Sequence, residues 1–384
     1  MIPHSHQTAR EDVLRSECLV CLSHHLGLSL DLLLNSSFKF AQPVAISVRQ
    51  RSETDVKSDD RLGIISYFCA MKIVLYVIMG LARLLARLPL RVLYVLSDCL
   101  FPLVYHVARY RRKLVRRQLK DSFPQHSPEW IRQTERKFYH FFCDYIIETL
   151  KLLHMSKEEI MRRVTFEGLD ELQAEMVKRN KQFAFVYLGH YGNWEWIASF
   201  SLHLRPEFSG GQIYHPLKNT MMDRFFVTLR EQFGGECIAM KETARHIITR
   251  SKGGAPEIIG FIADQCPKWE AQHHWTQFMN HKTSFFVGSE VLAKRVQACS
   301  LYVEVTRPER GYYHCRITPI SWEPCERANY EITDVYASAL EKQIQDQPEL
   351  WLWTHNRWKR TYEEWVRQSE TWHKTRKNST KDDL

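Results

Sequence analysis

The chain has 384 residues, of which 44% are hydrophobic and 12% aromatic, so it is long enough to bury a large core and to carry appendages. Its net charge of +9 favours acidic partners or an anionic surface, but no zinc-finger spacing, recognition-motif aromatics or long basic tail supports a nucleic-acid-binding protein. The ten cysteines are scattered and a chain of this size does not need disulfides, so we expect reduced thiols in a cytosol-facing protein.

The amino-terminal part of the chain divides into an extension and an apolar segment. Residues 1–70 lack sustained periodicity, and we expect a poorly ordered extension there. Residues 71–126 form a membrane-associating helical segment, in which Pro89 separates predicted helices over 72–88 and 90–120. The second helix ends in a cluster of seven basic residues with no acid. This pattern is typical of a segment held on an anionic cytoplasmic leaflet, and a buried helix with a solvated end is the alternative.

Residues 127–365 are predicted to form an α/β domain, and a polar tail follows over 366–384. Helices over 127–163 and 170–181 precede an alternation of short strands and amphipathic helices. The expected strands cover residues 183–188, 211–214, 237–240, 257–263, 301–307 and 312–320, and the expected helices between and after them cover 221–233, 242–251 and 329–345. This alternation predicts a central, mostly parallel or mixed sheet flanked by helices.

The first strand of this series leads into the most distinctive stretch of the chain. A run of apolar and aromatic residues over 183–188 breaks at Gly189, and His190 and Glu195 follow in the turn and the next helix, for which Asn193 is a plausible cap. Histidine accepts a proton near neutral pH, and the glutamate could hold its second ring nitrogen. The same residues are also compatible with a structural histidine at a strand end and a solvated glutamate.

Two further predicted strands end in polar residues. The candidate ligand-binding side chains at these ends are Tyr214, Lys218, Asn219, Arg224, Asp264 and Gln265. In an open α/β sheet, ligands bind beyond the carboxyl ends of the strands, so neighbouring strands would build one pocket from these residues and His190. Lys218 and Arg224 are equally compatible with ordinary surface charge.

The absence of several common motifs limits the reactions that this pocket could catalyse. The chain has no glycine-rich phosphate loop, no nucleophile elbow and no carboxylate cluster for a metal, so we expect neither a metal ion nor a cofactor. No serine or cysteine in the turn after Gly189 is placed as a nucleophile. A histidine base without a nucleophile of its own predicts direct transfer to a hydroxyl group on the substrate.

Four blocks of the sequence, taken in order, resemble a known family. They are the His190-x4-Glu195 motif, residues 214–219 with Arg224, residues 263–265, and the tryptophan-rich segment 348–359. Over residues 72–365 the chain resembles the lysophospholipid/glycerolipid acyltransferase superfamily and, more narrowly, the late acyltransferases of lipid A biosynthesis, with wording most similar to Bacteroidetes-type members. It departs from the family pattern at His215, where arginine is frequent, at Cys266, where a small hydroxyl residue is usual, and in its long amino-terminal extension.

The resemblance implies an enzyme that moves an acyl chain from acyl-carrier protein to a hydroxyl of a lipid A precursor, on the cytoplasmic face of the inner membrane. His190 would be the base and Glu195 its orienting group, and Tyr214, Lys218, Asn219, Arg224, Asp264 and Gln265 would shape the acceptor site. Trp351, Trp353 and Trp358 would lie either at the headgroup level or in the core.

Two other functions fit the same residues. Acyl transfer to a lysophospholipid or an amino lipid is the alternative within enzymes, because nothing in the pocket distinguishes these acceptors. A catalytically idle membrane-binding protein with the same fold is the alternative from another class, and the presence of both His190 and Glu195 counts against it.

Overall fold

The computed structural model describes Val77 and residues 79–217 and 219–369, and the expected extension over 1–70, Lys218 and most of the polar tail lie outside these residues. By their internal contacts, the described residues divide into two compact units. The first unit holds those up to Cys99 together with Ile146–Met155 and Pro216–Leu229. The second unit holds Leu100–Tyr145, Ser156–His215 and the residues from Arg230 onward.

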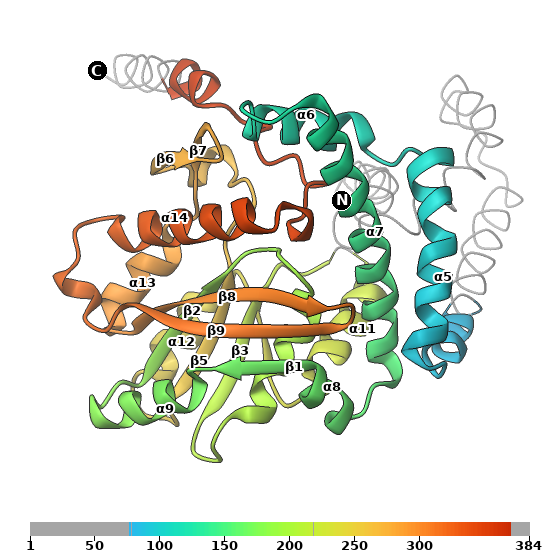
Figure 1. Ribbon diagram of the computed structural model, residues 1–384. Coiled ribbons are helices and arrows are strands. Elements are labelled where there is room, and N and C mark those ends of the chain that lie inside the picture. The colour runs from blue at the N-terminus through green and yellow to red at the C-terminus, as the bar shows by residue number, and fades with distance from the viewer. Residues whose placement is uncertain (1–76, 78, 218, 370–384) are drawn as a thin grey trace, which may run out of the picture. The chain divides into compact units, whose positions relative to one another are not determined.

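A seven-stranded sheet lies in the second unit, with the strand order β1-β9-β8-β2-β5-β3-β4. Its strands are β1 Val164–Glu167, β2 Phe183–Leu188, β3 Ser209–Tyr214, β4 Glu236–Ala239, β5 Glu257–Ile262, β8 Cys299–Glu309 and β9 Tyr312–Ser321. All neighbours are parallel except β8 and β9, whose long hairpin is prominent in Figure 1. A separate antiparallel pair consists of β6 Trp275–Phe278 and β7 His281–Ser284. The predicted mixed α/β sheet is therefore confirmed.

Helices flank this sheet. Those that lie wholly in the second unit are α6 Arg112–Ser122, α8 Lys157–Arg163, α9 Leu169–Lys178, α10 Trp194–Ile197, α12 Thr243–Arg250, α13 Gly288–Val296 and α14 Glu331–Asp346. Three others, α5 Leu90–Pro102, α7 Pro128–Lys151 and α11 Thr220–Glu231, include residues of both units. α13 and α14 pack on β2, and the 3₁₀ segment Ala198–His203 packs on β3.

The central strand β2 is buried on both faces, as the continuous apolar run of its six residues predicts. Tyr187 stacks on Phe261 of β5 and lies against Tyr336 of α14, with ring centroids 6.0 and 5.5 Å away. The Tyr336 hydroxyl donates a hydrogen bond of 3.0 Å to the carbonyl of Leu188, the last residue of β2. α14 therefore fixes the end of the strand from which the candidate turn departs.

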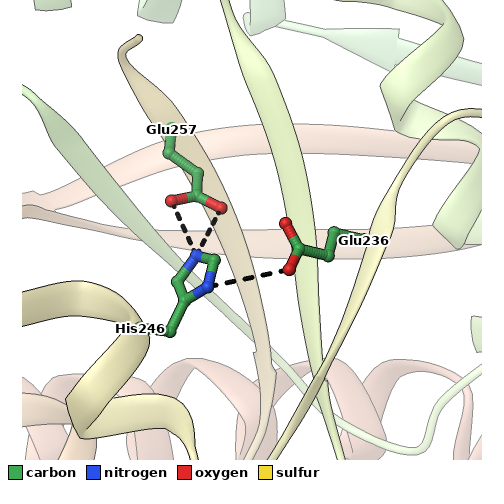
Figure 2. A group of neighbouring side chains, drawn as sticks. All are labelled: Glu236, His246 and Glu257. Carbon is green, nitrogen blue, oxygen red and sulfur yellow. Dashed lines mark hydrogen bonds and ion pairs between the residues drawn. The ribbon is translucent and has the colours of Figure 1, made fainter. Parts of the chain in front are cut away.

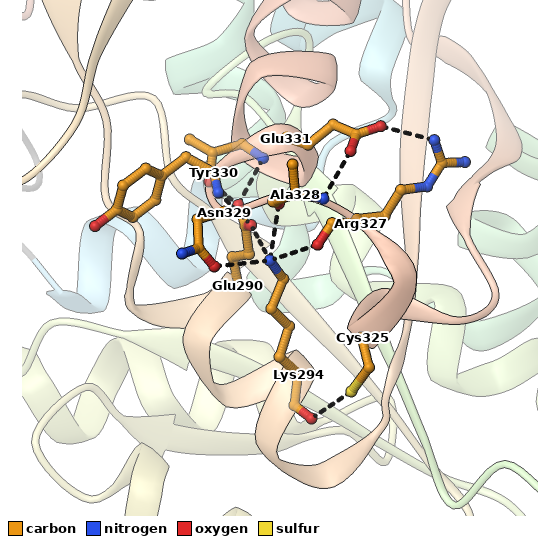
Figure 3. Close-up of polar contacts among 9 residues, drawn as sticks. Glu290, Lys294, Cys325, Arg327, Ala328, Asn329, Tyr330 and Glu331 are labelled. Carbon is orange, nitrogen blue, oxygen red and sulfur yellow. Dashed lines mark hydrogen bonds and ion pairs between the residues drawn. The ribbon is translucent and has the colours of Figure 1, made fainter.

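The start of α14 is anchored by a buried carboxylate on α13 (Figure 3). Glu290 is 2% exposed and accepts hydrogen bonds from the backbone nitrogens of Tyr330 and Thr333, at 2.7 and 3.0 Å, and from the Thr333 hydroxyl at 2.7 Å. Lys294 pairs with Glu290 at 3.2 Å and donates 2.8 Å to the carbonyl of Ala328. These bonds satisfy donors at the amino end of the helix, which have no partner within it.

The predicted helix over 90–120 is wrong in its middle. α5 ends at Pro102, a π-helical turn covers Leu103–Val107, and Arg109 and Arg111 then take left-handed backbone angles of φ 51° and 50°. Residues in this region cannot continue a right-handed helix, so α6 begins anew at Arg112. By length and composition, the stretch Leu90–Val107 is apolar enough to cross a membrane, which by itself is weak evidence that it does.

Two arginines of the basic cluster at residues 109–120 pair with a buried carboxylate, although the Arg116 side chain is still 47% exposed. Glu135 of α7 is fully buried, and both Arg112 and Arg116 pair with it, at 3.0 and 2.6 Å. A buried carboxylate needs such partners, because an unpaired charge is costly away from water. The interpretation of the whole cluster as a membrane-binding surface therefore needs correction for these two arginines.

Candidate functional site

His190 and Asp264 lie at the carboxyl ends of two neighbouring parallel strands. The register pairs Leu188 of β2 with Ile262 of β5, so the residues two positions later meet beyond the sheet. The Asp264 carboxylate accepts a hydrogen bond of 2.9 Å from the backbone nitrogen of His190 and contacts the ring Nδ1 at 2.5 Å. The two residues were predicted for one pocket from the polar strand ends, and the structure brings them into direct contact.

The partners of the two ring nitrogens define how His190 can act. Asp264 accepts at Nδ1, so this nitrogen carries the proton and Nε2 keeps its lone pair. The side-chain amide nitrogen of Gln265 lies 3.2 Å from Nε2 and donates to that lone pair. The His190 side chain is 18% exposed, so the ring is not fully enclosed, and Nε2 can accept a proton from a substrate once the Gln265 amide moves away.

Asp264 is held as a carboxylate inside the protein. Its side chain is 3% exposed, and burial alone raises the pKa of such a group. The neighbouring His190 and the hydrogen bonds from His190 and Trp351 outweigh burial and lower the pKa of Asp264 to about 2. The indole Nε1 of Trp351 donates this last bond over 2.8 Å. Asp264 therefore stays charged at neutral pH and fixes the orientation of the imidazole.

Gly189 is required by the close approach of α14 to the turn. A Cβ at this position would meet the side chain of Leu340 at 2.7 Å and the Asp264 carboxylate at 3.4 Å. Tyr191, on the other side of the histidine, donates its hydroxyl to the carbonyls of Gln343 and Gln347 at 3.1 and 2.9 Å. The turn that carries His190 is thus held directly by the carboxyl end of α14.

The tryptophan-rich segment binds this turn from its other edge. The Gly192 nitrogen donates 3.0 Å to the carbonyl of Leu350, and the Leu352 nitrogen donates 3.1 Å to the carbonyl of His190. Trp351 and Trp353 are 2% and 0% exposed, respectively. Their placement at a membrane headgroup level is therefore wrong, and the core alternative is right for both. The sequence pattern identified the segment as distinctive but did not indicate that it holds the histidine.

Glu195 does not contact His190, contrary to its expected role as the orienting group. Its carboxylate binds the guanidinium of Arg230 in a bidentate pair, at 2.7 and 2.6 Å, and the two side chains are 5% and 15% exposed. Asn193 caps the short helix α10, as predicted, by accepting from the Trp196 nitrogen at 3.1 Å. The capped helix α10 directs the Glu195 side chain toward Arg230. Asp264, instead of Glu195, accepts the hydrogen bond from Nδ1 of His190.

We expect the Glu195–Arg230 pair to be needed for folding. The change Glu195→Ala leaves the largely buried Arg230 without its carboxylate and should lower the free energy of unfolding by about 3–5 kcal/mol. Urea denaturation of the purified protein measures this change. Glu129→Ala, which breaks an exposed pair with Arg132, is the control and should leave the stability nearly unchanged. Equal stability of the two variants would contradict the structural role of the Glu195–Arg230 pair.

The other residues predicted to bind the ligand do not contact His190 in the described part of the chain. Tyr214 ends β3, the strand next to β5, and it is not among the residues that contact His190. Asn219 and Arg224 belong to the first unit, where the Asn219 side chain accepts from the nitrogens of Met221 and Met222 at the start of α11. Lys218 lies outside the described residues. The direct contacts of the histidine thus include Asp264 and Gln265 from the predicted set.

Within the described residues, one group of side chains is close enough to resemble a metal-ligand set (Figure 2). His246 contacts Glu257 through Nε2 at 3.0 Å and Glu236 through Nδ1 at 3.7 Å. Arg250 adds a positive charge 3.6 Å from Glu236. A metal ion binds a histidine through one ring nitrogen, so both carboxylates would have to lie on the side of that nitrogen. Here Glu257 faces Nε2 and Glu236 faces Nδ1. The arrangement instead gives the buried Glu257 a hydrogen-bond partner in His246 and a positive charge in Arg250, whose Nε lies 3.9 Å away.

Comparison with known proteins agrees with this geometry. The sequence profile of the family described as bacterial lipid A biosynthesis acyltransferase matches residues 65–360. The chain is also similar to the lipid A biosynthesis palmitoleoyltransferase of Escherichia coli K12, with 24% identity over 298 residues that cover 73% of this chain and 89% of that protein. The lipid A biosynthesis acyltransferase of Shigella flexneri matches with the same identity and coverage.

Proposed function

Because the chain belongs to the family of bacterial lipid A biosynthesis acyltransferases, we propose that it moves a fatty acyl chain from acyl-carrier protein to a hydroxyl of a lipid A precursor. The family establishes an acyltransferase of lipid A biosynthesis. The observation that carries the finer proposal is the polarised histidine: Nδ1 of His190 is held by a buried carboxylate, and Nε2 faces the side-chain amide of Gln265.

In the proposed reaction, His190 acts as the general base. Nε2 accepts the proton of the substrate hydroxyl while that oxygen attacks the carbonyl carbon of the thioester. The carbon–sulfur bond then breaks, the acyl chain remains on the new ester oxygen, and the leaving thiolate takes the proton back from Nε2. Gln265 must release Nε2 when the hydroxyl arrives, because its amide nitrogen lies 3.2 Å from that atom. No covalent intermediate on the enzyme is needed.

Asp264 supports this step without touching the reacting atoms. It fixes the Nδ1–H tautomer and stabilises the imidazolium that forms when Nε2 takes the proton. Trp351 holds the same carboxylate through its indole nitrogen, so the tryptophan-rich segment acts as a positioning element for the base. Glu195 is assigned a structural role through Arg230 in this proposal.

The proposed place of action is the cytoplasmic face of the inner membrane. The helical stretch Leu90–Val107 has apolar side chains that are exposed in this structure, including Val95 at 60%, Leu103 at 57% and Val107 at 75%. Such side chains gain stability when they enter the apolar layer of a membrane. This contact would give the enzyme access to a lipid acceptor, while the soluble carrier protein delivers the acyl chain from the cytoplasm.

We expect the purified protein to transfer an acyl chain from acyl-carrier protein to a lipid A precursor in detergent micelles. Mass spectrometry of the product should show one added acyl chain, and lipid A from a deletion strain should lack the same chain. Lysophospholipid and amino-lipid acceptors tested in parallel provide the comparison. Transfer to one of those lipids and not to the lipid A precursor would replace the proposed acceptor, and no transfer to any lipid would contradict the proposed activity.

A further inference from the structure

Four positively charged side chains gather beside the His190 site in the second unit. Arg357 and Lys359 lie in the tryptophan-rich segment, Arg360 follows it directly, and Arg111 precedes helix α6. We call these four residues the cationic cluster. Arg111 belongs to the basic cluster that was predicted to face a membrane, and no individual role was predicted for the other three residues.

The start of α6 is bound to the segment that carries the other three cations. Arg111 donates 2.9 Å from Nη1 to the carbonyl of Thr354. Gln118, two turns further along the helix, donates to the carbonyls of Trp353 and His355 at 2.8 and 3.0 Å and accepts from the Arg357 nitrogen at 2.9 Å. These four bonds fix Arg111 next to the residues around Lys359.

Arg360 connects the cluster to the residues that follow Gln265. Its Nη1 donates 3.2 Å to the carbonyl of Pro267 and lies 3.7 Å from the Cys266 sulfur, and its guanidinium lies over the Trp269 ring at 5.6 Å. His355 accepts a hydrogen bond of 3.2 Å from the Cys266 nitrogen through Nε2. Gln265, the residue before Cys266, contacts Nε2 of His190. Arg360 is therefore linked to the proposed base through two consecutive residues, Cys266 and Gln265.

Positive charge exceeds negative charge around the cluster, although the buried Asp264 carboxylate acts on Arg357. None of the four cations forms an ion pair with a carboxylate among the described residues. Burial and then the nearby Arg360, Arg111 and Arg357 lower the pKa of Lys359. Arg357 is 2% exposed, and its Nε has no hydrogen-bond partner in the described part of the chain. Like charges held this close repel one another, and a bound anion would relieve the repulsion.

We propose that the cationic cluster binds a phosphate group of the lipid acceptor next to the hydroxyl that His190 activates. The proposal rests on the proposed function for the nature of the acceptor. The three guanidinium groups and the ammonium group of the cluster are of the kinds that bind phosphate oxygens most effectively, through paired and charge-assisted hydrogen bonds. The bound phosphate would position the acceptor hydroxyl at Nε2, which is how remote binding groups contribute to catalysis.

The position of the cluster favours the acceptor over the acyl donor as the source of the phosphate. The phosphate of a carrier protein is separated from its thioester by the whole length of the pantetheine arm. An anion on the cluster lies within a few side chains of His190, because Cys266 and Gln265 bridge the two. If the phosphate of the acyl donor bound to the cluster, the pantetheine arm would carry the thioester past His190. If a phosphate of the acceptor lipid bound there, a nearby hydroxyl of the same lipid would lie at Nε2.

The test measures binding of a phosphorylated lipid A precursor and of the same lipid after enzymatic removal of its phosphate. His190→Asn protein is used as the background, so that no transfer occurs during the titration. Adding Lys359→Gln or Arg360→Gln should weaken binding of the phosphorylated lipid by about 10–100-fold and leave binding of the dephosphorylated lipid unchanged. Lys120→Gln, an exposed lysine of α6, is the matched control and should change neither affinity.

Two outcomes would overturn the proposal. An equal loss of affinity for both lipids would show that the cations act only on the fold, and a loss seen only in the KM for acyl-carrier protein of the otherwise wild-type enzyme would assign the cluster to the donor. Because the titration needs no turnover, it separates this inference from the proposed activity. Wild-type protein that binds the phosphorylated lipid through the cluster but transfers no acyl chain would contradict the activity alone.

Discussion

Replacement of His190 by asparagine is expected to lower the rate of acyl transfer by ~10²–10⁴-fold, the usual contribution of a positioned base. The asparagine amide reproduces the donor that faces Asp264, so the buried carboxylate keeps a partner. It has no counterpart of Nε2, so the substrate hydroxyl has no proton acceptor. The loss should appear in kcat, with little change in the KM of either substrate. A transfer assay with purified enzyme and acyl-carrier protein measures both constants.

The matched control for this change is a second histidine that also contacts an aspartate. His274 lies 2.7 Å from Asp334 through Nε2 and is outside the proposed site. His274→Asn should keep the wild-type kcat. His190→Ala should also abolish transfer, but at an additional cost in stability because Asp264 loses its partner. Full transfer activity in either His190 variant would refute its assignment as the base.

Replacement of Asp264 by asparagine is the second change with a large expected effect, a fall in kcat of about 10³–10⁴-fold. One carboxylate oxygen accepts from the His190 backbone nitrogen and from the Trp351 indole, and the other faces Nδ1. An amide whose oxygen faces the two N–H donors turns its NH₂ group toward Nδ1. That contact requires an unprotonated Nδ1 and moves the proton to Nε2, so the base is lost.

The pH dependence of protein stability tests independently whether the Asp264 carboxylate is ionised and paired in the folded protein. Its pKa is lowered from 3.8 to about 2 in the folded protein, so the unfolded state binds the proton more readily. The contribution to stability, on the order of 2 kcal/mol, is therefore fully present above pH ~4 and is lost as the pH falls through about 2. Urea denaturation at a series of pH values should show the stability difference between wild type and Asp264→Asn shrinking over this interval.

Asp334→Asn is the control for the aspartate, because it removes a carboxylate from a histidine pair at the surface, where Asp334 is 43% exposed. It should leave kcat at the wild-type value. If Asp264→Asn kept wild-type kcat while its stability fell as expected, Asp264 would be a structural residue and the proposed positioning role would be wrong.

The sequence predicted the architecture well because the sheet is built from local signals. The uniform apolar run of β2 and the alternation of strands and helices are visible without tertiary information, and β2 matches its predicted bounds. The break between α5 and α6 was missed because left-handed backbone at Arg109 and Arg111 has no sequence signal comparable to glycine.

The candidate site was predicted in part. The polar strand ends correctly placed His190, Asp264 and Gln265 together, since the strands that precede them are neighbours. The partner of the histidine was misassigned, because spacing in the chain favours Glu195, whereas the contact depends on the register of two strands that are far apart in sequence. The role of Trp351 was missed for the same reason, because its contact with Asp264 spans 87 residues.

The bonds between the tryptophan-rich segment and the rest of the second unit also determine when the site can form. Gln118 and Trp353 are separated by 235 residues, and Arg111 and Thr354 by 243. Contacts of such long range form late in folding, because the chain must close a large loop before they stabilise it. During synthesis, a nascent chain that has not reached residue 351 lacks both the indole that holds Asp264 and the strand partner of the His190 turn. The ribosome-bound protein is therefore expected to be inactive, and acyl transfer begins only when almost the whole chain has been made.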